Sequence, residues 1–106
     1  MPDVYTTGWW RPEEGHTEAF VEAWTEFARW ASSQAGAGTI RLARDLKNEG
    51  YFVSFARWDS FEHMRAWKEA DEFKPRMGRV QEHVAEFRAT ELEVVVALVE
   101  TEAPAR

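Results

Sequence analysis

The chain has 106 residues, of which 44% are hydrophobic and 30% charged, and this balance predicts one folded domain over residues 1–106 with a core over about 4–100. The formal net charge is -6, and no basic cluster interrupts it. Nucleic acid and anionic membranes are therefore poor candidates as partners.

Individual residue types narrow the kinds of site and the cellular location that the sequence allows. The absence of cysteine excludes disulfides, iron–sulfur clusters and thiolate metal sites. The first ten residues lack the plan of a signal peptide and no apolar run could span a bilayer, so we expect a cytoplasmic protein. His16, His63 and His83 show no ligand spacing, which argues against a metal site. The six tryptophans are either large core residues or the wall of a pocket for a flat aromatic ligand.

The first third of the chain predicts a strand followed by a long helix. Residues 4–10 are rich in β-formers, and Gly8 within them marks a bulge or a close backbone approach. Residues 16–34 carry the clearest amphipathic pattern of the chain, which Gly36 ends. The apolar positions at helical spacing are Phe20, Ala23, Trp24, Phe27 and Ala31.

The middle of the chain predicts a hairpin that continues into a helix. Residues 39–45 alternate in polarity, and after the loop 47–50 the aromatic stretch 51–58 reads as a second hairpin strand. Asp59 and Ser60 are short polar residues of the kind that cap helices. The apolar residues that follow them at helical spacing are Phe61, Met64 and Trp67.

The last third predicts a helix and a final strand. Residues 71–87 are apolar at helical spacing, with Asp71 as the expected N-cap and Pro75 near the first turn. Residues 91–100 (ELEVVVALVE) predict a strand that is apolar on nearly both faces. The order β-α-β-β-α-β indicates an α+β, ferredoxin-like fold with an antiparallel four-stranded sheet and helices on one face.

One face of this sheet lacks a cover. Tyr51, Val53 and Phe55 point away from Ser54 and Trp58, because successive strand residues face opposite sides. The residues of the last predicted strand are apolar on both sides as well, yet the helices suffice for one face. We therefore expect a homodimer in which two sheets pack face to face.

Three stretches of the chain resemble the antibiotic-biosynthesis monooxygenase domain family. They are Leu42-Ala43-Arg44-Asp45, the run from Tyr51 to Trp58-Asp59-Ser60-Phe61-Glu62, and Ala66-Trp67 with Glu72-Phe73-Lys74. The similarity spans roughly residues 8–99. It implies a dimeric α+β barrel, and an activity from a family that contains cofactor-free oxygenases of polycyclic phenols, heme-degrading enzymes and many members of unknown activity.

At two positions this chain differs from the heme-degrading members of the family. That group shares the spacing from Trp58 to Trp67, and it uses a histidine ten residues beyond the second tryptophan and an asparagine in the first strand. Here those positions hold Met77 and Gly8. The resemblance therefore disfavours heme degradation of that kind, while heme or another flat ligand could still occupy the pocket.

The cofactor-free members are more similar to residues 51–58. They carry a tryptophan at the position of Trp58 and a polar residue four positions earlier, which is asparagine in the quinone-forming type and Ser54 here. Ser54 and Trp58 lie on one strand face, about 13 Å apart. Ser54 could bind a phenol or phenolate, and the Trp58 indole could stabilise an oxyanion.

These features predict a cofactor-independent monooxygenase that oxidises an aromatic, phenolic small molecule with O2. The expected catalytic residues are Ser54, Trp58 and Trp67, and the expected apolar wall is Phe20, Trp24, Phe73 and Met77. A heme protein and a non-catalytic dimer that binds a small aromatic are the alternatives. Arg76 and Arg79 are loose matches to a family arginine, or else surface residues.

Overall fold

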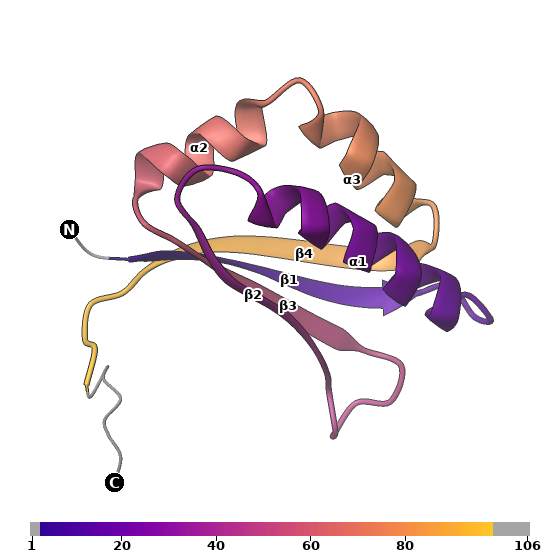
Figure 1. The fold of residues 1–106 in the computed structure, drawn as a ribbon. Coiled ribbons are helices and arrows are strands. Elements are labelled where there is room, and N and C mark those ends of the chain that lie inside the picture. Colours follow the sequence, from indigo (N-terminus) through magenta and orange to yellow (C-terminus); the bar gives the residue numbers. More distant parts are fainter. Residues whose placement is uncertain (1–2, 99–106) are drawn as a thin grey trace, which may run out of the picture.

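The computed structural model describes residues 3–98, which form a four-stranded antiparallel sheet with the strand order β2-β3-β1-β4 and three helices on one face (Figure 1). The elements are β1 Val4–Pro12, α1 Thr17–Ser32, β2 Ala37–Arg44, β3 Phe52–Trp58, α2 Phe61–Glu69, α3 Phe73–Gln81 and β4 Val84–Glu93. The predicted ferredoxin-like fold is confirmed. No helix within residues 3–98 is long and apolar enough to cross a membrane.

The two central strands, β1 and β3, alternate strictly between buried and half-buried residues. Their inward side chains meet the helices, because each strand turns every second residue toward the same face. Ser54 and Trp58 both point inward, so the prediction that they share one strand face is confirmed, and this face is the one that the helices cover. Gly8 lies directly opposite Ser54 in the β1–β3 register.

Helix α1 packs across the sheet with its apolar stripe inward. Phe20, Phe27 and Ala31 are buried, whereas the glutamates of the opposite side are exposed. Gly36 follows in the left-handed region with φ of 82°, which lets the chain turn sharply into β2. Helix α2 begins at Phe61, and the hydroxyl of the preceding residue, Ser60, accepts a hydrogen bond from the backbone N–H of His63 as a helix cap.

The hydrophobic core is largely aromatic. Trp58, Phe20 and Met64 are fully buried between the sheet and the helices. The Trp58 and Trp67 rings stack with their centroids 4.7 Å apart, which joins β3 to α2. Full burial of a large apolar side chain contributes about 1.5–3 kcal/mol each, so this layer holds the two faces together.

The boundary between the last helix and the last strand differs from the prediction. Helix α3 ends at Gln81 and β4 begins at Val84, whereas the sequence predicted a helix to residue 87. The register of β1 against β4 shifts between Arg11 and Pro12, and this irregularity inserts one extra residue into β4. Val84 and Phe87 therefore face the helices together, and their spacing of three residues imitates a helix.

The earlier start of β4 also moves its end. The predicted strand over residues 91–100 is wrong, because β4 ends at Glu93 and residues 94–98 lie outside the sheet; residues 99 and 100 lie outside the described part. Val95, Val96 and Leu98 are 86%, 70% and 78% exposed. The predicted cap at Asp71 is also wrong, because Glu72 is the N-cap and makes no side-chain cap bond.

The fold brings together two histidines that are distant in the sequence. The Nδ1 atoms of His16 and His83 lie 3.2 Å apart, because the Glu13 backbone N–H donates to the His83 carbonyl and ties the two loops together. The three histidines of the chain were expected to lie far apart, and this expectation is wrong for His16 and His83. Among residues 3–98, no group of three or more histidine, aspartate or glutamate side chains is placed to hold a metal ion.

Candidate active site between the sheet and the helices

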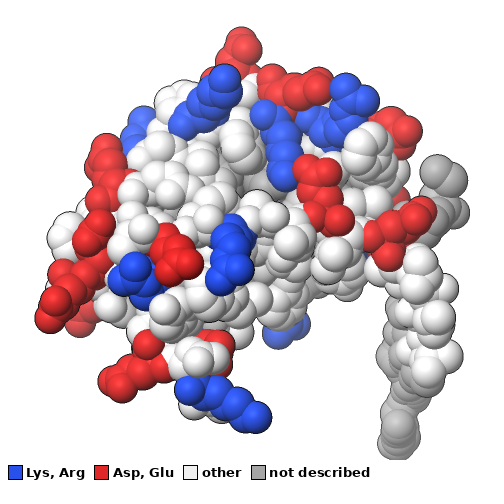
Figure 2. Space-filling view, turned by 180° about the vertical axis from the view of Figure 1, so that it is seen from behind, with Lys and Arg blue, Asp and Glu red and all other residues white. Residues whose placement is uncertain are grey.

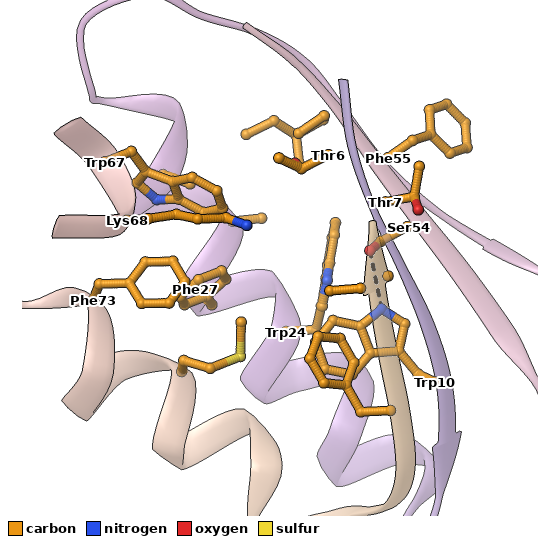
Figure 3. A pocket seen from close by; sticks show the side chains of 18 residues that line it. Thr6, Thr7, Trp10, Trp24, Phe27, Ser54, Phe55, Trp67, Lys68 and Phe73 are labelled. Atoms are coloured by element: carbon orange, nitrogen blue, oxygen red, sulfur yellow. Dashed lines mark hydrogen bonds between the residues drawn. The ribbon is translucent and has the colours of Figure 1, made fainter. Parts of the chain in front are cut away.

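A cavity of about 230 Å³ lies between the inward face of the sheet and the three helices. Most of its wall is apolar, and Figure 3 shows the helix side facing the sheet side across it. The large apolar side chains of the wall are Trp24, Phe27, Trp67, Phe73, Met77 and Phe87. A mostly apolar cavity with few polar groups is the usual form of a small-molecule site.

The sheet side of the cavity contains a hydrogen-bonded pair, Trp10 and Ser54. The Trp10 Nε1–H donates to Ser54 Oγ over 2.9 Å, and both side chains are buried (Figure 3). Since the indole occupies an acceptor site of the hydroxyl, the Ser54 O–H stays free to donate. Ser54 can therefore donate a hydrogen bond to an oxygen of a bound ligand.

Gly8 makes room for this pair. A Cβ atom at Gly8 would lie 2.6 Å from Trp10 Nε1 and 2.8 Å from Ser54 Oγ, both far inside normal contact. The Trp10 indole can lie across β1 and reach Ser54 only because residue 8 has no side chain. Gly8 is thus a close approach of a side chain to the backbone, one of the two interpretations that the sequence allowed.

The two tryptophans of the β3–α2 region have different positions. Trp67 is 7% exposed and lines the cavity, whereas Trp58 is fully buried behind it and does not. Neither indole N–H has a hydrogen-bond partner. Both nitrogen atoms are also inaccessible, so the Trp67 ring forms part of the cavity wall while its N–H is not exposed to the cavity.

Lys68 carries the one charge in the cavity wall of the described structure. Its Nζ lies 2.7 Å from Glu91 Oε2, an ion pair that links α2 to β4. In Figure 3 the Lys68 side chain runs beside Trp67 with Nζ directed toward the sheet. Its side chain is 30% exposed, so the ammonium lies at the edge of the cavity rather than deep within it.

The model of the family described as Antibiotic biosynthesis monooxygenase matches residues 5–77. The chain belongs to this family. The match covers all of the residues that line the cavity except those of β4. No curated protein matches the chain significantly.

Several solved structures share this fold with the chain at low sequence identity. SnoaB, a cofactor-independent oxygenase from Streptomyces nogalater, is 16% identical with a TM-score of 0.83, covering 94% of this chain and 100% of its own. A Deinococcus radiodurans protein assigned to the same family is 16% identical with a TM-score of 0.80, covering 93% and 99%. A conserved Methanosarcina mazei protein is 12% identical with a TM-score of 0.78, covering 87% and 92%.

The structure places five of the seven residues proposed from the sequence in the cavity wall. These are Ser54, Trp67, Trp24, Phe73 and Met77. Trp58 and Phe20 lie behind the wall, where Trp58 stacks on Trp67 and Phe20 packs between Trp10 and Phe52. The resemblance to the family and the alternation of a strand indicate which face of the sheet a residue occupies. They do not show which residues of that face line the cavity and which lie behind its wall.

Sequence reasoning missed Trp10 and Lys68. Trp10 could have been found from the sequence, because it lies two residues after Gly8 on β1 and residues two apart on a strand share a face. Lys68 follows Trp67 directly in the sequence, but it is not part of the apolar stripe of α2, so no pattern predicted its place in the cavity wall. Of the arginines, Arg76 pairs with Glu72 and lies over the Trp30 ring, and neither Arg76 nor Arg79 lines the cavity.

Proposed function

We propose that the protein is a cofactor-independent monooxygenase that oxidises a small aromatic phenol with O2. The observation that carries this proposal is the pairing of a nearly apolar cavity with a buried donor, the Ser54 hydroxyl. Donors fixed in an apolar cavity stabilise an oxyanion far better than water-exposed ones, because no solvent reorganises around the charge. The description of SnoaB as a cofactor-independent oxygenase supports the same class.

The reaction needs little from the protein beyond binding and electrostatics. A deprotonated phenol with an electron-rich ring carbon adds that carbon to O2 and forms a peroxide. Protonation of the peroxide and loss of water leave a carbonyl, so one oxygen atom enters the product and the other leaves as water. Ser54 holds the phenolate oxygen, and the aromatic wall, Trp67 included, orients the ring.

Trp58 has a supporting role in this proposal. Its indole is fully buried and stacks on Trp67, so it fixes the plane of the ring that the substrate contacts. We therefore assign contact with the substrate to Trp67 and positioning of Trp67 to Trp58. Removal of the Trp58 ring changes the substrate contact indirectly.

Oxygen uptake with an anthrone-type phenol tests the proposal. We expect uptake by the wild-type protein and a decrease of about tenfold or more in kcat for Ser54→Ala. Trp9→Phe is the matched control, because Trp9 lies on the opposite face of the sheet. Saturable quenching of tryptophan fluorescence without uptake across a panel of such phenols would instead indicate a non-catalytic binding protein.

The cavity fits heme poorly. No histidine, cysteine or tyrosine lines it, and the sulfur of Met77 accepts a contact from Gln81 Nε2 at 3.7 Å. Its volume of about 230 Å³ also lies below the range of about 300–1,000 Å³ that is usual for pockets of drug-sized ligands. We therefore propose no step that involves heme.

We also propose that the protein forms a homodimer through the outward face of the sheet. All three helices lie on the other face (Figure 1). The outward face carries a stacked pair of rings, Trp9 and Tyr51, together with Val53, Phe55 and Leu92. An apolar face of this kind favours association with a second copy, which would also cover the exposed valines of residues 94–98. Away from it, acidic and basic side chains mix over the top of the molecule (Figure 2).

A further inference from the structure

The cavity wall carries a single charge, and this charge is positive. Of the 18 residues that line it, Lys68 alone is charged, and no carboxylate or imidazole is among them. The Ser54 O–H can donate as well. A cavity with a free hydroxyl donor, one cation and no carboxylate favours ligands that offer acceptors, above all negatively charged ones.

Lys68 is held at the cavity edge by a partner that a ligand can replace. Glu91 of β4 lies opposite Thr6 of β1 in the register, and Thr6 lines the cavity. The Glu91 side chain is 46% exposed, so it regains water readily when it releases the lysine. The Lys68 side chain runs beside Trp67 in the cavity wall, so its ammonium is within reach of an anionic group of a ligand at the cavity edge.

We propose that the substrate carries a further anionic oxygen, a carboxylate or a second ionised phenol, which displaces Glu91 and pairs with Lys68, apart from the phenolate oxygen that Ser54 binds. This inference rests on the proposed function and narrows it to flat aromatic acids. Lys68 thus determines specificity, whereas Ser54 and Trp67 contact the reacting part of the ring system.

Equilibrium binding followed by tryptophan fluorescence tests this inference without turnover. One probe pair is 2-naphthoate and its neutral isostere 2-naphthamide, and the other is 4-nitrophenolate and neutral 4-nitroanisole. We expect at least one anion to bind the wild-type protein about fivefold to tenfold more tightly than its neutral isostere, since charge-assisted hydrogen bonds are the stronger ones. The pair that shows the preference distinguishes a carboxylate from a phenolate.

Variants assign the preference to Lys68. Lys68→Met should remove it, Lys68→Arg should retain it, and Glu91→Gln should increase it because the competing carboxylate is gone. Arg65→Met is the control, because Arg65 lies on the same helix but pairs with exposed Glu69 outside the cavity wall. Equal binding of anions and neutral isosteres, or a preference that survives in Lys68→Met, overturns the inference. Since none of these measurements needs O2 uptake, absence of oxidation would refute the proposed function alone.

Discussion

Substitution of Gly8 by alanine tests how the Trp10–Ser54 pair is accommodated. On an ordinary strand Gly→Ala would stabilise by about 0.5–1 kcal/mol, because glycine loses the most backbone freedom on folding. Here the new Cβ would lie 2.6 Å from Trp10 Nε1 and 2.8 Å from Ser54 Oγ. The indole must move, so the 2.9 Å hydrogen bond between two buried groups is lost.

The magnitude follows from two costs. Buried donors and acceptors that lose their partner cost about 1–3 kcal/mol, and overpacking of a filled interior costs about 1–3 kcal/mol. We therefore expect Gly8→Ala to lower the free energy of unfolding by about 2–4 kcal/mol, and Tm by roughly 10 °C or more for a domain of this size. Thermal unfolding followed by circular dichroism measures both.

Two further variants make the test specific. Gly78→Ala is the matched control, because no atom lies within 4 Å of a Cβ at this helical position, and it should stabilise by about 0.5–1 kcal/mol. In a Trp10→Phe background the two nearest atoms of Trp10 are absent, so Gly8→Ala should cost less than in the wild type. An unchanged or raised Tm of Gly8→Ala in the wild-type background would refute the reasoning.

Three other outcomes are expected. Hemin titration should give no saturable Soret shift at micromolar concentration, because the wall offers no imidazole ligand; a saturable shift that Met77→Ala removes would contradict this. Light scattering should give a dimer mass for the wild type and a monomer mass for Phe55→Asp, which places a charge on the outward face, and a wild-type monomer would exclude the dimer. In the hairpin loop, hydrogen bonds from the Asn48 side chain and the Lys47 backbone N–H hold the pKa of the Asp45 carboxyl below its ordinary value of 3.8. Its contribution to stability is therefore present above that value and lost as the pH falls through the lower pKa of the folded state; an NMR titration should show this lowered pKa, and Asn48→Ala should raise it toward 3.8.

Local pattern was enough for most of the fold. The alternation of residues 51–58 and the polar cap at Ser60 predicted β3 and the start of α2, because period and capping chemistry are properties of neighbouring residues. The same alternation placed Ser54 and Trp58 on one face of the strand. The family resemblance, which the match over residues 5–77 confirms, rests on these stretches too.

Contacts between distant parts of the chain decided the features that local sequence patterns did not predict. The irregularity opposite Pro12 places Val84 and Phe87 on one face, and it depends on the register with β1, which the sequence of β4 alone does not show. Likewise, Trp10 reaches Ser54 across two strands only because Gly8 leaves room, and Trp58 lies behind Trp67 because the two rings stack. The sequence by itself determined which side chains of an element share a face, through the period of that element. Only the tertiary structure decided which of these line the cavity, because that depends on contacts between residues far apart in the chain.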